Sequence, residues 1–254
     1  MPFLDHLEEL RWRLVKSLAA LVGSFFVSFY VTWIYFGQII DWMVRPILPL
    51  LDSGKLVYTH PMGKFTILMQ MAGIVAGIMA SPVIGYQIWC FLSPALNPRE
   101  RKVIIPVLGF AALLFLAGVA LAVFIFVPVT AQMMTALQSD SLTSMITAEA
   151  YFSFMFFICL AFGAVFEMPI LVLILTALGM ITPQALKSVR RWAIVISLVV
   201  CEVITPGDAV ISTLILWIPV YGLYELSIVV SWFVYRARKK REAAAARIEA
   251  EAGV

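Results

Sequence analysis

The sequence has few charged residues: Lys and Arg number 18 and Asp and Glu 15 in 254 residues, or 13% of the chain. Soluble domains usually carry about 25%, and a soluble protein of 28.3 kDa needs more charge on its surface. Hydrophobic residues make up 63% and the mean hydropathy is +0.99. These values exclude an ordinary cytosolic protein and a disordered chain, and they argue against an outer-membrane barrel. The composition predicts an all-α, polytopic membrane protein.

Cysteine and histidine are scarce as well. Cys90, Cys159 and Cys201 stand in apolar runs without metal-ligand spacing, and an odd number predicts no disulfide framework. His6 and His60 are the only histidines, and no phosphate-binding loop, nucleophile motif or metal cluster accompanies them. The sequence therefore predicts no catalytic residue, no metal site and no cofactor, so the protein is not expected to be an enzyme. A net charge of +3 is too small to predict nucleic-acid binding.

Six apolar segments are candidates for membrane-spanning helices. They are expected at about 14–36, 65–92, 103–129, 151–178, 192–204 and 209–235. At about 1.5 Å per residue, the first four can cross a hydrocarbon layer of roughly 30 Å. The fifth helix is expected to be short, because the 17 steps from Arg191 to Asp208 span only roughly 25 Å if all helical. The sixth is expected to be short because Glu225 interrupts the last apolar run. The alternative is one long sixth helix with Glu225 near the membrane surface.

The spans are expected to form a single membrane domain over residues 1–235. An amphipathic helix at 2–13 leads into the first span, and a basic, then Ala/Glu-rich tail follows at 236–254. Fifteen of the 18 basic residues fall on the side of the two termini, and three fall on the other side: Arg45, Lys55 and Lys64. Because basic loops stay in the cytoplasm, both termini are predicted to be cytoplasmic.

Two acids stand out in the basic segments on the cytoplasmic side. Glu9 lies on the polar face of the N-terminal helix, and Glu100 lies in the loop before the third span. Each has a structural explanation. Glu9 can pair with Arg13 one turn later, which is worth roughly 0.2–0.5 kcal/mol, and Glu100 can sit at N3 of a helix capped by Asn97. Glu100 could equally present its carboxylate to a cationic ligand; for Glu9 the residue types favour the structural explanation and leave this role as the alternative.

Two further acids lie in or beside the membrane. Glu167 is well inside the fourth span, where an unpaired charge costs at least about 2.5 kcal/mol. It is either a functional carboxyl or a neutral one bonded to a carbonyl freed by Pro169. Asp208 stands at N3 of the sixth helix, after the cap residue Thr205. There it is expected to stabilise the helix N-terminus by roughly 0.3–1 kcal/mol.

Taken in order, these segments resemble the TatC family, the multispanning receptor subunit of the twin-arginine protein translocase. The match runs from about residue 4 to residue 235. Its motifs are His6-Leu7-x-Glu9-Leu10-Arg11, Ser81-Pro82, Gln87-x-Trp89-x-Phe91, Pro94-Ala95-Leu96, Glu100-Arg101, Phe162-Gly163-x-x-Phe166-Glu167-x-Pro169 and Thr205-Pro206-x-Asp208. Each motif is moderately specific, and the ordered set is highly specific.

The resemblance implies a glove-like, concave bundle of six helices. It implies a core receptor that binds twin-arginine signal peptides and exports folded proteins with the proton-motive force. The signal-peptide-binding positions it implies are Glu9, Glu100, Arg11 and Phe91, and Glu167 matches an acid in the concave face. Four other positions are implied to be partner contacts or structural residues: Pro46, Thr205, Asp208 and Ser212.

The implied partners are the signal peptides of folded cargo, single-span TatA- and TatB-type membrane proteins, and further copies of the same chain. The implied location is the lipid bilayer of the prokaryotic inner membrane. The chain departs from the family pattern at Gln70, Glu202, Gly207 and Ser212, which leaves details of partner contact open.

Two other classes of function stay open from the residues alone. An intramembrane carboxyl such as Glu167 would also suit a proton-coupled transporter of small solutes. A purely structural scaffold for assembly would need no preference for arginine pairs.

Overall fold

The computed structural model describes residues 3–50, 56–92, 104–136, 146–177, 179–204 and 211–252. These ranges are almost entirely helical, and the only strand-like feature in them is one bridge between Val57 and Thr147. In chain order the helices are α1 (Phe3–Ile34), α2 (Phe36–Val44), η1 (Leu48–Leu50), α3 (Gly63–Leu92), α4 (Ile104–Leu121), η4 (Ala122–Phe126), α5 (Val127–Ala136), α6 (Ala148–Phe166), α7 (Met168–Ala177), α8 (Pro183–Ser188), α9 (Arg190–Ile204) and α10 (Ile211–Ala252). The predicted all-α class is confirmed.

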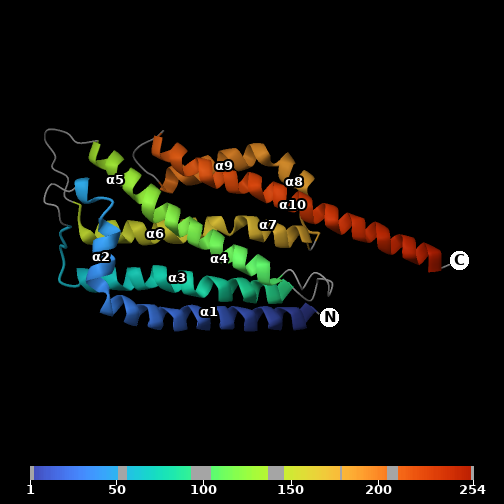
Figure 1. Cartoon of the computed structure of the whole chain (residues 1–254), viewed down its shortest axis with the longest axis horizontal. Helices are drawn as coiled ribbons and strands as arrows, with labels where there is room; N and C mark the ends of the chain where they lie inside the picture. The colour runs from blue at the N-terminus through green and yellow to red at the C-terminus, as the bar shows by residue number, and fades with distance from the viewer. Residues whose placement is uncertain are drawn as a thin grey trace.

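Five segments of the described chain are long and apolar enough to cross a membrane. They are Glu8–Ile34, Gly63–Phe91, Gly109–Gln132, Ala148–Ala177 and Leu216–Lys239. α9 has only 15 residues, which is about 22 Å and less than a hydrocarbon layer of about 30 Å. The protein is therefore multi-pass, and the fifth helix of the expected set is short. Both termini lie at the same end of the bundle (Figure 1), which we call the terminal end.

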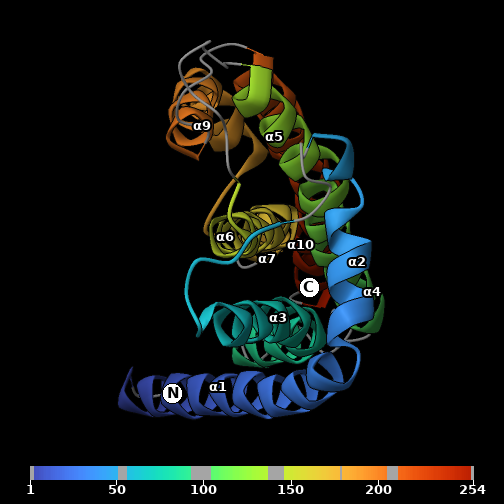
Figure 2. The ribbon, with the colours of Figure 1, turned by 90° about the vertical axis from the view of Figure 1, so that its left-hand side faces the viewer.

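The helices form a curved layer rather than a closed bundle. Figure 2 shows α1 beside α3 at one side, α6 and α7 in the middle and α9 at the other side. A wall made of α2, α4, α5 and α10 connects them. The closest helix pairs agree with this picture: α1 packs on α3, α4 on α6, and α10 on both α7 and α9. We call the side away from the wall the concave face.

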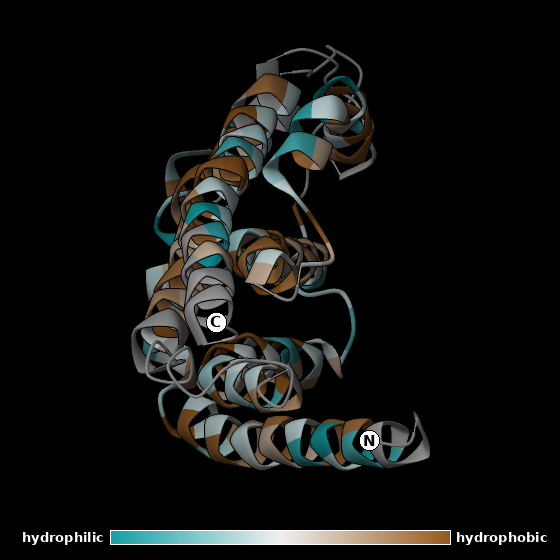
Figure 3. Ribbon diagram, turned by 90° about the vertical axis from the view of Figure 1, so that its right-hand side faces the viewer, coloured by the Kyte–Doolittle hydropathy of each residue, from teal (hydrophilic) through white to brown (hydrophobic). Residues whose placement is uncertain are grey.

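The outward surfaces are apolar, as a lipid environment requires. Figure 3 shows mostly hydrophobic residues along the helices and a polar stretch of α1 near the N-terminus. Large side chains such as Leu18, Phe26 and Phe157 are more than half exposed. In water this much exposed apolar surface would drive association, whereas in a bilayer it faces lipid at little cost.

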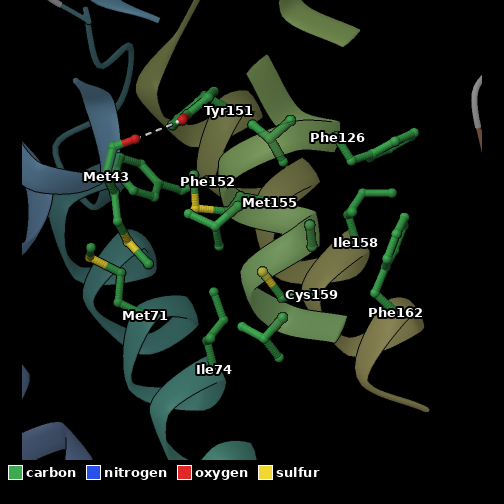
Figure 4. Packing of buried hydrophobic residues seen from close by; sticks show 14 of the residues in the cluster. Met43, Met71, Ile74, Phe126, Tyr151, Phe152, Met155, Ile158, Cys159 and Phe162 are labelled. Atoms are coloured by element: carbon green, nitrogen blue, oxygen red, sulfur yellow. Dashed lines mark hydrogen bonds between the residues drawn. The ribbon is translucent and has the colours of Figure 1, made fainter. Parts of the chain in front are cut away.

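The main core lies between α2, α3, η4 and α6 (Figure 4). Phe126, Phe152, Met155 and Ile158 are almost completely buried there. Tyr151 spans the core, since its hydroxyl donates to the carbonyl oxygen of Met43 at 2.9 Å. This bond holds α2 across the start of α6. α2, which lies at the end of the bundle opposite the termini, is thereby fixed to the bundle.

Two of the spans are not single straight α-helices. The third, expected at 103–129, extends to residue 136 and contains the π-helical turn η4 just before Pro128, which has no N–H to donate to the preceding turn. The fourth, expected at 151–178, begins at Ala148 and is divided into α6 and α7 at Glu167. Pro169 causes the break because it cannot donate to the carbonyl oxygen of Val165.

The expectation of a short sixth helix is wrong for the helix as a whole. α10 has 42 residues and continues without a break through Glu225 and through the expected boundary at 235. Glu225 does not interrupt it, because Arg190 Nη2 and the Tyr221 hydroxyl each donate to its carboxylate at 2.7 Å. The tail continues the helix because it is rich in Ala, Glu and Arg, which are strong helix formers.

Candidate functional site

A candidate recognition site lies where the first turns of α1 meet the last turns of α3, at the terminal end. Arg13 Nη2 donates to Glu9 Oε1 at 3.0 Å, and Arg13 Nη1 donates to Gln87 Oε1 of α3 at 3.3 Å. The Glu9–Arg13 pair that the helix spacing predicts is therefore present. About a quarter of each side chain stays exposed, 27% for Glu9 and 25% for Arg13. The carboxylate is thus held by a guanidinium but is still open to solvent.

We call the four predicted signal-peptide-binding positions the rim residues: Glu9, Arg11, Phe91 and Glu100. The three other than Glu9 are placed as follows. Arg11 is exposed on α1, two residues after Glu9. Phe91 is half-buried in the last turn of α3, one turn after Gln87 and therefore on the same helix face. Glu100 lies outside the described residues. The structure thus brings Glu9 and the α3 end carrying Phe91 to one place.

A pocket of about 430 Å³ opens on the concave face between α1, α3, α4 and α6–α7. Its walls are mostly apolar, and polar groups are contributed by Glu167, Ser81 and Trp89. Trp89 is 4% exposed, and its indole N–H has no hydrogen-bond partner within the described part of the chain. A buried donor without a partner costs free energy. A ligand that brings an acceptor into this pocket would recover that cost.

Glu167 ends α6, where its backbone N–H bonds to the carbonyl oxygen of Ala164 at 3.2 Å. Among the described residues, no hydrogen bond joins its carboxyl to a carbonyl freed by Pro169. The structural explanation for this acid is therefore not observed. Instead, the carboxyl lines the pocket on the concave face.

The short helix α9 is attached to α10 by three polar contacts. Arg190 bonds to Glu225 at 2.7 Å, the Trp217 indole donates to Ser197 Oγ at 2.9 Å, and Thr213 donates to Glu202 at 2.8 Å. The face of α9 opposite Arg190 and Ser197 is apolar and exposed; it consists of Trp192, Val195, Ile196 and Val199. These contacts were not predicted. Arg190 and Ser197 are seven residues apart, which places both on one face of a helix. This spacing is the sequence signal that could have indicated a polar contact face on α9.

The family model described as "Sec-independent protein translocase protein (TatC)" matches residues 5–219. The chain belongs to the TatC family. TatCd of Bacillus subtilis (strain 168) is 37% identical over 243 residues, which is 96% of each chain. TatC of Aquifex aeolicus (strain VF5) is 36% identical over 244 residues, or 94% of this chain and 98% of that protein.

Solved structures agree with this assignment. A crystal structure described as the twin arginine translocase receptor TatC matches with a TM-score of 0.75 and 34% identity, covering 90% of this chain and 99% of the other. The same protein in DDM matches with a TM-score of 0.76. TatC proteins are components of a protein translocase, so the role is in transport rather than catalysis. The small-solute transporter gains no support from these comparisons.

Two departures from the TatC pattern have structural partners here. Gln70 Nε2 of α3 donates to Ser153 Oγ of α6 at 2.7 Å. Glu202, unusual in an apolar fifth helix, accepts the bond from Thr213 described above. Both residues therefore join neighbouring helices. The third departure, Gly207, lies outside the described residues.

The remaining predicted residues are far from Glu9 or outside the described chain. Pro46 is in the turn between α2 and η1, at the end opposite the termini, beside a second pocket of about 410 Å³ lined in part by Arg45 and Leu48. Thr205 and Asp208 lie outside the described residues. Ser212 is in the first turn of α10, but its side chain is not described. In the described ranges, no cluster of three His, Cys, Asp or Glu could hold a metal ion.

Proposed function

We propose that this chain is the core receptor of a twin-arginine translocation system. It binds the twin-arginine signal peptides of folded cargo at the terminal end, which faces the cytoplasm, and exports the cargo across the prokaryotic inner membrane with the proton-motive force. The observation that carries the proposal is the guanidinium of Arg13 on the Glu9 carboxylate. This contact supports Glu9 as an acceptor for an arginine side chain of a peptide.

Two carboxylates at the rim suit a pair of arginines. A guanidinium presents a planar fork that can bond both oxygens of a carboxylate, whereas lysine is a point charge. Glu9 and Glu100 would each accept one arginine of the peptide. Because exposed ion pairs give only about 0.2–1 kcal/mol each, partial desolvation at the headgroup level must add to the discrimination.

The apolar part of the signal peptide would continue along the concave face into the pocket beside Glu167. Apolar walls favour an apolar segment. The unpaired indole N–H of Trp89 offers a bond to a backbone carbonyl of that segment. The rim and the pocket would therefore recognise two different parts of one peptide.

Filling this pocket should weaken binding of the apolar part of the peptide without affecting its arginine part. Ala164 is exposed and lines the pocket, so Ala164→Trp is expected to occupy it. We expect photo-crosslinks from the apolar part of a bound peptide to fall several-fold, while crosslinks from the arginine part persist. Phe157→Trp, on the same helix at a lipid-facing position outside the pocket, is the matched control. Equal losses at both parts of the peptide would contradict a separate pocket for the apolar segment.

The exposed apolar face of α9 is the proposed docking surface for single-span TatA- and TatB-type partners. The contacts of Arg190 and Ser197 with α10 lie on the other side of α9, and Glu202 lies at the edge of this face, so its apolar side chains stay open. Thr205 and Ser212, which flank the turn between α9 and α10 in sequence, would contribute to the same contact. Further copies of the chain would join these partners in a larger complex.

Asp208, expected at N3 of the sixth helix, is proposed to stabilise the N-terminus of that helix rather than to take part in export. If so, Asp208→Asn should lower stability slightly, by roughly 0.3–1 kcal/mol, because the amide still accepts a cap bond but loses the charge. Export should stay intact. The measurement is thermal stability of the purified variant together with export of a twin-arginine reporter. Normal stability with lost export would show a direct role instead.

Site-specific photo-crosslinking tests the proposed function. Membranes containing the full chain are mixed with a twin-arginine signal peptide that carries a photoactivatable group, and with the same peptide in which both arginines are lysines. We expect crosslinks to α1 and α3 near Glu9 with the first peptide and several-fold fewer with the second. Equal crosslinking of both peptides would instead indicate a scaffold without preference for arginine pairs.

A further inference from the structure

Glu9 is already occupied by a guanidinium from its own chain. We infer that Arg13 is an internal competitor for the recognition carboxylate, and that an arginine of the signal peptide must displace it. This inference rests on the proposed function, since it concerns the same carboxylate. It goes further because it gives Arg13 and Gln87 roles in setting how strongly a peptide must bind before it is captured.

The geometry singles out Arg13 among the basic residues of α1. Arg13 is one turn after Glu9 and reaches its Oε1 at 3.0 Å, as an i,i+4 pair should. Arg11 and Lys16 are exposed, and in the described part of the chain Glu9 has no ion pair other than the one with Arg13. Arg13 therefore presents to Glu9 the same chemical group that a peptide arginine would bring.

Gln87 keeps the guanidinium in place from the other side. Its Oε1 accepts from Nη1 of Arg13 at 3.3 Å, while Nη2 serves Glu9. The two nitrogens of one planar group are thus used at once, and the side chain is fixed between α1 and α3. A second anchor reduces the entropy that Arg13 loses on pairing with Glu9. Gln87 is therefore a positioning residue that acts through Arg13.

The contact is weak enough to be displaced. An i,i+4 pair on an exposed helix surface contributes about 0.3–0.5 kcal/mol, and both partners keep about a quarter of their side-chain surface exposed. An internal competitor lowers the apparent affinity of every peptide by the same factor, because only the open fraction of the site can bind. Arg13 therefore leaves the ratio of the Kd values for arginine and lysine peptides unchanged. It raises both Kd values, so that a weakly binding lysine peptide occupies less of the site.

Peptide affinity of Arg13 variants tests this inference. The full chain is placed in lipid nanodiscs, and the Kd of a fluorescent twin-arginine peptide and of its two-lysine counterpart is measured by anisotropy. Arg13→Gln removes the competitor. Gln87→Ala loosens it and leaves every charge in place. Lys16→Gln is the matched control, since it removes one positive charge from the same helix at an exposed residue that forms no ion pair with any described residue.

Arg13→Gln is expected to lower Kd by about two- to fivefold relative to Lys16→Gln, by the same factor for both peptides. Gln87→Ala should give a smaller decrease. In a Glu9→Gln background, Arg13→Gln should have no further effect on peptide affinity, because the contested carboxylate is gone. The thermal unfolding midpoint is measured in parallel, to separate binding from stability. If Arg13 had only a structural role, Arg13→Gln would change the midpoint with and without Glu9→Gln, and it would not lower Kd.

The outcomes distinguish the inference from the proposed function. Suppose that Glu9→Gln weakens binding, but that neither Arg13→Gln nor Gln87→Ala lowers Kd more than Lys16→Gln does. Arg13 is then not a competitor, and only the inference is overturned. If Glu9→Gln leaves the Kd of the twin-arginine peptide unchanged, the proposed recognition site itself is wrong.

Discussion

Replacing Glu9 and Glu100 together with alanine is expected to abolish detectable crosslinking of a twin-arginine peptide to this chain. Each carboxylate is proposed to hold one guanidinium, and an exposed pair alone contributes about 0.2–1 kcal/mol. With partial desolvation at the membrane surface, we expect the loss of both to weaken binding at least tenfold, or about 1.4 kcal/mol. Each single variant should retain part of the binding.

Glu8→Ala is the control for this experiment. Glu8 is the neighbouring acid on the same helix, it is exposed, and no ion pair involves it in the described residues. It should bind the peptide as the unaltered chain does, which excludes a general effect of lost negative charge. Unchanged crosslinking in the double variant, with normal amounts of protein in the membrane, would remove both carboxylates from the recognition site.

Gly118→Ala is expected to destabilise the protein by about 1–3 kcal/mol, the usual cost of overpacking. A Cβ at Gly118 of α4 would lie 2.8 Å from the backbone carbonyl oxygen of Phe162 and 2.9 Å from Cγ of Phe166, both on α6. A backbone atom cannot rotate away, so α4 and α6 would have to separate. The measurement is the thermal unfolding midpoint of the protein purified in detergent.

Gly109→Ala on the same helix is the matched control. A Cβ at Gly109 meets no atom of the described residues within 4 Å, and alanine favours helix over glycine by up to about 1 kcal/mol. This variant should therefore be as stable as the unaltered chain or slightly more stable. Equal midpoints for Gly118→Ala and Gly109→Ala would show that α4 and α6 do not pack as closely as the structure indicates.

Much of the fold follows from the composition of the sequence and from the positions of its prolines. The long apolar runs predict multi-pass helices, and both irregular spans contain the proline responsible, Pro128 or Pro169. The length of α10 agrees with the alternative of one long sixth helix rather than with the expected interruption at Glu225. Its compensation by Arg190 and Tyr221 depends on which face of α9 meets α10, a tertiary fact absent from local sequence.

The candidate site was predictable only where its contacts are local. The Glu9–Arg13 pair follows from helical spacing, and the structure contains it. The bond from Arg13 to Gln87 joins residues 74 positions apart, so it depends on the register between α1 and α3. The same limit applies to the pocket beside Glu167, where Trp89 comes from a different helix. Family resemblance, rather than residue spacing, connected these helices beforehand.

Export in the native host tests the proposed receptor function most directly. The gene for this chain is deleted and then restored, and a folded reporter carrying either a twin-arginine signal peptide or its two-lysine version is followed across the inner membrane. We predict that export of the twin-arginine reporter is lost on deletion and regained on restoration, while the two-lysine reporter stays inside. Undiminished export of the twin-arginine reporter after deletion would contradict the proposed function.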